Sequence, residues 1–138
     1  MPHISKQKLD KEVLRSINDR LVDILADITL KEDIHDFIND LLTRTERIML
    51  AKRLAIVVML HKGYPFGVIR RTLKVSESTI SAMRDRTDRG GKGFEKALRR
   101  LEKDKRLEKF IANLDRIIRL FAMPPIAGKG RWKFLVPR

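Results

Sequence analysis

Hydroxyl, carboxylate and basic side chains are concentrated in the stretch Phe66–Arg86, FGVIRRTLKVSESTISAMRDR. A hydroxyl can donate to or accept from a base edge in the major groove of duplex DNA, and a carboxylate can accept from cytosine N4. A basic side chain binds phosphate oxygens, which fixes the register on a duplex without reading its sequence. We therefore expect base contacts from Glu77, Ser78, Thr79 and Ser81, phosphate contacts from Arg70, Arg71, Lys74, Arg84 and Arg86, and a place for Ser76 in the same interface.

The apolar residues of this stretch predict two short helices that share one small core. Ile69 and Leu73 are four residues apart on one helical face, and Ile80 and Met83 are three apart on another. Val75 lies in the joint, where both faces can close over it. The spacing predicts a helix-turn-helix, which presents the N-terminal end of its second helix to the major groove. The alternative is an ordinary helical hairpin whose outer face is solvated.

The joint of this helix pair carries its own signals. Ser76 is placed to cap the second helix, and Thr79, at its third position, is expected to point its side chain freely outward. Many such turns carry glycine where this chain has Lys74. A left-handed conformation at a lysine costs about 1–2 kcal/mol, which a cooperative core can offset.

The charge of the chain indicates a polyanionic partner. The net charge is +13 and the isoelectric point is near 10.5. Residues 1–42 contain six Lys or Arg and nine Asp or Glu, a net −3, so the 25 basic and 9 acidic residues that follow carry +16. Nucleic acid is the partner that such an asymmetry favours, although ribosomal and membrane-surface proteins are basic as well.

Several classes of protein are disfavoured by the composition. The 138 residues suit one domain, there is no cysteine, and His3, His35 and His61 do not form a metal-ligand pair, so we expect no metal and no cofactor. We find no Ser/His/Asp set and no paired carboxylates in an apolar setting, and we expect no enzyme. No apolar run approaches the roughly 18 residues that span a bilayer, and the N-terminus is mostly polar, which predicts a cytoplasmic protein without membrane contact.

Apolar residues at spacings of three and four predict further amphipathic helices over roughly 6–28, 30–42, 44–61 and 94–121. The wide apolar stripe of the first suggests burial on more than one side, and the third should be central. Thr43–Glu46 matches a capping box. The basic side of the last helix either follows phosphates or is a solvated face. We expect a helical domain over 1–123 and a basic, aromatic tail over 124–138.

Three features together resemble the tryptophan repressor superfamily: Leu41–Arg47 (LLTRTER), Arg53 in the following helix, and the helix-turn-helix Val68–Met83 with its Thr-Ile-Ser sequence. The similarity covers about Asp33–Arg86. It is closer to a branch of bacterial regulators related to that repressor than to the repressor itself. The resemblance implies an all-α, intertwined homodimer whose two helix-turn-helix units face successive major grooves.

The resemblance also assigns positions within the site. It places recognition positions on Glu77, Ser78, Thr79 and Ser81, and a backbone-contacting basic position on Arg70. The corepressor site of the tryptophan-binding members corresponds to Leu41, Thr43 and Arg53, the candidate effector-binding residues. Ala82 stands where those members carry the arginine that stacks on the indole, which disfavours tryptophan as the effector. In that case Thr43 and Arg53 serve as a helix cap and a salt-bridge partner.

Two functions from different classes compete on this sequence. The first is a sequence-specific transcriptional regulator, a repressor by resemblance, that binds double-stranded DNA as a homodimer. The alternative is a nucleoid-architectural or RNA-binding protein that uses the same basic surface without base readout. The tail and the basic side of the last predicted helix favour the alternative.

Overall fold

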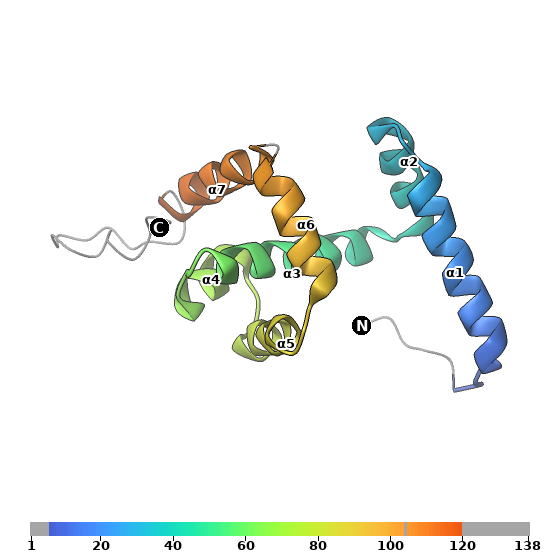
Figure 1. Ribbon diagram of the computed structural model, residues 1–138. Helices are drawn as coiled ribbons and strands as arrows, with labels where there is room; N and C mark the ends of the chain where they lie inside the picture. The colour runs from blue at the N-terminus through green and yellow to red at the C-terminus, as the bar shows by residue number, and fades with distance from the viewer. Residues whose placement is uncertain (1–5, 104, 120–138) are drawn as a thin grey trace, which may run out of the picture. The chain divides into compact units, whose positions relative to one another are not determined.

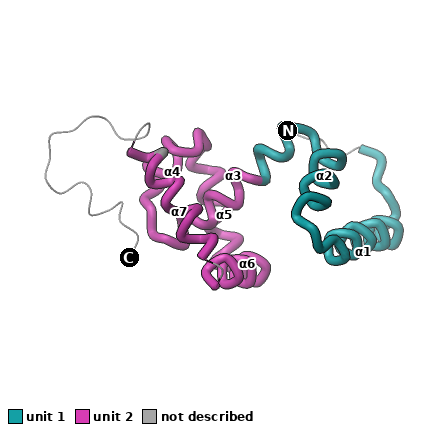
Figure 2. Tube along the Cα trace, turned by 90° about the horizontal axis from the view of Figure 1, so that it is seen from above, with its two compact units in different colours: residues 1–50 teal, residues 51–138 magenta. Residues whose placement is uncertain are grey.

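The computed structural model describes residues 6–103 and 105–119, and these residues form helices and no strand (Figure 1). The all-α fold class is thereby confirmed. The predicted tail, residues 124–138, lies outside the described residues. The chain divides into two compact units, Met1–Leu50 and Ala51–Arg138 (Figure 2). The helices are α1 (Lys11–Asp27), α2 (Lys31–Leu41), α3 (Arg44–His61), α4 (Phe66–Leu73), α5 (Glu77–Asp88), α6 (Lys92–Lys103) and α7 (Arg106–Ile117).

The first unit contains α1, α2 and the beginning of α3. Helix α1 begins later than its apolar pattern predicts, because the Asp10 carboxylate accepts from the backbone N–H groups of Glu12 and Val13 and so caps the helix at that point. Where α2 gives way to α3, Arg47 donates to the carbonyl oxygens of Asn39 and Leu42, at 3.1 and 3.2 Å. The junction between α2 and α3 is therefore fixed by the Arg47 side chain of α3.

No residue of α1 or α2 is buried. Large apolar side chains of α1 are between 42% and 62% exposed, although their spacing is that of a core-facing stripe. The exposed apolar residues of α1 are Val13, Leu14, Ile17, Val22, Ile24 and Leu25. Most of the apolar face of α1 is therefore exposed, and Leu21 on the same face is half-buried.

The second unit has a well-packed core around α3, with α4 to α7 arranged about it (Figure 1). Residues 55–59 of α3 are all buried, which confirms the prediction that this helix is central. Each of the other helices contributes apolar side chains to the same cluster. These are Val68 and Ile69 from α4, Ile80 and Met83 from α5, Leu98 from α6, and Leu107, Ile111 and Leu114 from α7, with Ile118 following α7.

The prediction of one long helix over 94–121 is wrong, because α6 ends at Lys103 and α7 begins at Arg106. Lys105 adopts a left-handed conformation, with φ of 56°. The break turns the chain so that Leu107 and Ile111, which are 1% and 6% exposed, join the core around α3. A straight continuation of α6 would carry these side chains away from that core, so burial of apolar area outweighs the strain at Lys105.

Two polar contacts join the end of α3 to the last two helices. Nε2 of His61 lies 3.1 Å from Oε1 of Glu102 on α6. The Tyr64 hydroxyl, in the turn after α3, donates to the Asp115 carboxylate on α7. Burial of Tyr64, which is 4% exposed, and this hydrogen bond both raise the pKa of its hydroxyl.

Candidate nucleic-acid interface

Helices α4 and α5 form the helix-turn-helix that the apolar spacing predicts. Ile69 and Ile80 are fully buried and Met83 is 4% exposed, while Leu73 and Val75 pack partly buried against the same core. The two helices are thus held by apolar contacts on their inner sides, and their polar side chains face outward.

The turn between α4 and α5 is left-handed at Lys74, with φ of 54° and ψ of 52°. The backbone N–H groups of Lys74 and Val75 both donate to the carbonyl of Arg70, which closes the end of α4. The Lys52 ammonium on α3 donates to the Lys74 carbonyl oxygen at 3.5 Å. The strained residue is therefore anchored to both α4 and the central helix.

A cluster of three hydroxyls begins α5. Ser76 Oγ accepts from the backbone N–H of Thr79 at 3.3 Å, which confirms the predicted N-cap. The same oxygen lies 3.0 Å from Ser78 Oγ and 2.9 Å from Thr79 Oγ1. The Thr79 side chain is exposed, but the expectation that it points freely outward is wrong, because Ser76 holds its hydroxyl. All three hydroxyls are exposed and keep acceptor capacity for a ligand.

The outward face of α5 also carries an acid that the sequence reasoning missed. Asp85 lies four residues after Ser81 and seven after Ser78, so the three side chains share one helix face. Asp85 is exposed and, within residues 6–103 and 105–119, has no ion-pair partner; the same holds for Glu77. A carboxylate is repelled by phosphate but accepts from an amino group on a base edge. The i, i+3, i+7 spacing of Ser78, Ser81 and Asp85 in the sequence was the available signal.

The structure brings together only some of the predicted phosphate contacts. Arg70 and Arg86 are exposed, and Arg71 donates from Nε to the Gly67 carbonyl at 3.1 Å. Arg84 is oriented differently. Its guanidinium lies 5.7 Å from the centroid of the Phe66 ring, and its Nε lies 3.7 Å from Asp88 Oδ2. Arg84 on α5 therefore contacts Phe66 of α4 as well as Asp88 of its own helix.

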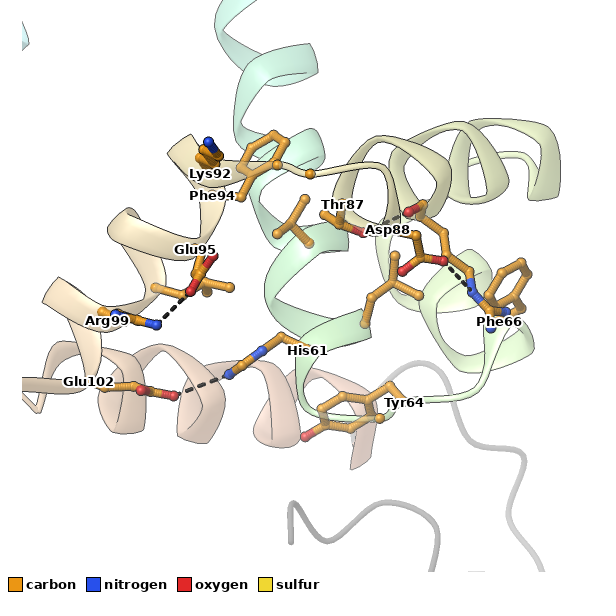
Figure 3. Close-up of a pocket in the computed structure, with 17 residues that line it drawn as sticks. His61, Tyr64, Phe66, Thr87, Asp88, Lys92, Phe94, Glu95, Arg99 and Glu102 are labelled. Atoms are coloured by element: carbon orange, nitrogen blue, oxygen red, sulfur yellow. Dashed lines mark hydrogen bonds and ion pairs between the residues drawn. The ribbon is translucent and has the colours of Figure 1, made fainter.

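Arg84 also lines a cavity of about 940 Å³ within the second unit (Figure 3). Val57, Leu60 and Leu98 are among its apolar lining residues. Figure 3 shows Glu95 beside Arg99 and His61 beside Glu102 at its rim. The Glu95–Arg99 ion pair measures 2.6 Å. Because Arg84 pairs with Asp88 and Glu95 pairs with Arg99, the charges of the rim largely cancel, and the cavity carries no strong local charge of one sign.

The candidate effector-binding residues Leu41, Thr43 and Arg53 do not line this cavity. Leu41 ends α2 and is 51% exposed, and Arg53 is exposed on α3 without a polar partner among the described residues. Thr43 forms the predicted capping box. Its N–H donates to the Glu46 carboxylate at 2.7 Å, and its Oγ1 accepts from the Glu46 N–H at 3.2 Å. The hydrogen bonds from Thr43 lower the pKa of Glu46.

Other kinds of site find little support in the part of the chain that the structure describes. It contains no group of three or more His, Cys, Asp or Glu side chains that could hold a metal ion. None of its helices combines the length and apolar character needed to cross a membrane.

These features define an all-helical protein with an exposed helix-turn-helix. The chain belongs to the family described as Trp repressor protein, whose model matches residues 17–102. The family resemblance of the sequence is thereby confirmed, and membership indicates a DNA-binding regulator of the helix-turn-helix class. The searches of curated proteins and of solved structures found no match.

Proposed function

We propose that the protein is a transcriptional regulator that reads a specific DNA sequence as a homodimer. The observation that carries the proposal is the exposed N-terminal end of α5, where three hydroxyls and Glu77 are supported by a buried helix-turn-helix core. Such an end is the part of a recognition helix that contacts base edges. Family membership supports the DNA-binding part of the proposal.

The polar and acidic side chains of α5 have a different role from the basic side chains around them. Glu77, Ser78, Thr79 and Ser81 contact base edges, with Ser76 holding the hydroxyls in place. Phosphate contacts come from Arg70, Arg71, Lys74 and Arg86. The contacts of Arg84 with Phe66 and Asp88 compete with a phosphate contact. Its first role is therefore to orient α5.

The homodimer is supported by the uncovered apolar face of α1. An exposed apolar surface of this extent favours a protein partner. A second copy of the chain offers the same face, and a two-fold arrangement can cover both at once. Two copies of α5 then read two half-sites, which predicts a palindromic operator.

Selection from a random duplex DNA library tests this function. The purified full-length protein is mixed with the library at about 150 mM salt, near physiological ionic strength, and the retained DNA is sequenced. An enriched palindrome with half-sites about one helical turn apart is the expected result. Retention without enrichment would contradict sequence-specific readout and favour the alternative, a nucleoid-architectural or RNA-binding protein.

A further inference from the structure

Helix α6 carries its basic residues along one side. Successive residues of an α-helix are about 100° apart, and this spacing places the five basic side chains of α6 within an arc of roughly 100° around the helix. All of them are exposed. They make up a surface that we name the basic stripe: Lys92, Lys96, Arg99, Arg100 and Lys103.

The acids of α6 neutralise only part of the basic stripe. Glu95 and Glu102 lie together on its flank, where Glu95 pairs with Arg99 and Glu102 pairs with His61 of α3. The described residues offer no hydrogen-bond or ion-pair partner to the other four cations of the stripe. A solvated helix face usually mixes both signs, since like charges three or four residues apart destabilise a helix. The stripe therefore lowers helix stability unless an external anion binds to it.

The surroundings of the stripe indicate which kind of polyanion it can bind. The opposite side of α6 is occupied, because Leu98 is 8% exposed and Phe94 and Leu101 pack against the core. The helix thus has no free apolar face to insert into a membrane surface. The stripe also contains no aromatic side chain on which unpaired bases could stack. A regular row of phosphates on a duplex matches it best.

The charge of the helix-turn-helix itself is small. Residues 66–88 contain five Lys or Arg and three Asp or Glu, a net +2, whereas residues 89–103 contain six and two, a net +4. The connection from α5 to α6 is only Arg89–Gly91. Arg89 and α6 together therefore carry +4 of the net +6 of residues 66–103, a short distance along the chain from the recognition helix.

We propose that the basic stripe is a second contact for duplex DNA, which binds backbone phosphates and does not read sequence. This inference rests on the proposed function, and it adds a source of affinity outside the helix-turn-helix. From Lys92 to Lys103 the stripe is about 16 Å long, from a rise of 1.5 Å per residue. Phosphates of one strand are about 3.4 Å apart along the duplex axis, so about five lie within that length.

The test compares the full-length protein with two variants of equal charge. The stripe variant combines Lys92→Gln, Lys96→Gln, Arg100→Gln and Lys103→Gln. The control variant combines Lys11→Gln, Lys31→Gln, Lys109→Gln and Arg116→Gln, four exposed residues spread over α1, α2 and α7. Fluorescence anisotropy measures binding of a labelled non-operator duplex between 50 and 200 mM salt, and circular dichroism checks that both variants keep their helices.

The salt slope is the slope of the logarithm of the binding constant against the logarithm of the salt concentration. Loss of four phosphate contacts should make this slope about 3.6 less steep in the stripe variant. Over this fourfold range of salt, the wild type then loses about 150-fold more affinity than the stripe variant does. The control variant should lose less than about one unit of slope. Equal losses in both variants would overturn the proposal, since net charge alone would explain them. A stripe-dependent slope with an RNA duplex but not with DNA would also overturn it.

Library selection with the stripe variant separates this inference from the proposed function. The variant should enrich the same palindrome as the wild type, with affinity reduced by the same factor for all sequences. If the wild type enriches no sequence but the stripe variant loses more salt slope than the control variant, the proposed function is wrong and the phosphate contact of the stripe is retained. If enrichment occurs and the slopes of the two variants agree, the stripe alone fails.

Discussion

Ser76 Oγ lies 2.9 Å from Thr79 Oγ1 and accepts the backbone N–H of the same residue. The residue that caps α5 thus also orients a side chain that we propose reads a base. Local helix stability and the geometry of the reading surface depend on one oxygen atom. Substitutions at the two positions should therefore have different effects, which the next two predictions separate.

Ser76→Ala should lower the free energy of unfolding by about 1 kcal/mol, because the N–H of Thr79 loses its capping acceptor. Urea denaturation measures the change as a shift of the midpoint. Ser78→Ala is the matched control, since its hydroxyl is exposed and caps no N–H; it should stay within about 0.5 kcal/mol of the wild type. Equal destabilisation by both substitutions would remove the capping role from Ser76.

Thr79→Ala should change the preference for one base pair of the operator by about 1–3 kcal/mol and leave the other positions unchanged. The reason is that a hydroxyl contact carries sequence information, whereas a phosphate contact does not. Competition between operator variants measures the preference, and Thr79→Ser, which keeps the hydroxyl, should largely preserve it. A uniform loss of affinity across all variants would argue against base readout by Thr79.

Arg71→Ala should weaken binding to every duplex by a similar factor and reduce the salt slope by about one, as expected for one lost phosphate contact. Titrations at several salt concentrations provide both quantities. Arg84→Ala should behave differently, because Arg84 stacks on Phe66 and pairs with Asp88. We expect Arg84→Ala to lower the free energy of unfolding and to leave the salt slope unchanged. A salt slope reduced by about one in Arg84→Ala, with unchanged stability, would show that Arg84 contacts DNA.

Ile17→Asp should shift the protein from dimer toward monomer, since it places a charge in the middle of the exposed apolar face of α1. Sedimentation equilibrium measures the association constant. Ser16→Asp adds the same charge outside the apolar face of α1, about 100° around the helix from Ile17, and should leave association unchanged. A wild-type protein that is monomeric at micromolar concentration would refute the proposed homodimer.

We expect the free energy of unfolding to fall at alkaline pH because of Tyr64. Its pKa is raised in the folded protein from an ordinary value near 10. The neutral hydroxyl is thus favoured by folding, so its stabilisation is complete below pH 10 and is lost as pH rises toward the folded pKa. Tyr64→Phe should lower the free energy of unfolding by about 1–2 kcal/mol at neutral pH and make it less dependent on pH above 10.

Tyrosinate absorbance isolates this group, because the chain contains a single tyrosine. In the folded protein the absorbance should rise only above pH 10, and in urea it should rise near pH 10. Coincident titrations in the two states would show that Tyr64 is not held by Asp115.

The features that sequence predicted well are those set by neighbouring residues. The cap at Ser76 and the capping box of Thr43 and Glu46 each depend on side chains within a few positions. The family resemblance, which rests on Leu41–Arg47, Arg53 and Val68–Met83, was confirmed by the family match over residues 17–102.

The features that sequence could not predict depend on distant contacts. No glycine or proline marks the end of α6, since packing of α7 residues on the core decides that break. Tyr64 and Asp115 are 51 residues apart, and no local pattern pairs them. Arg84 could be recognised as basic, but its direction is set by Phe66 on another helix.

The central claim is that α5 reads a DNA sequence, and the most direct test is a specificity ratio. Affinity of the full-length protein is measured at about 150 mM salt for the duplex enriched by selection and for a scrambled duplex of the same composition. We predict a ratio of at least about 10³, which falls by one to two orders of magnitude when Ser78, Thr79 and Ser81 are all changed to alanine. A ratio near one for the wild type, or a ratio unaffected by the triple substitution, would contradict base readout by α5.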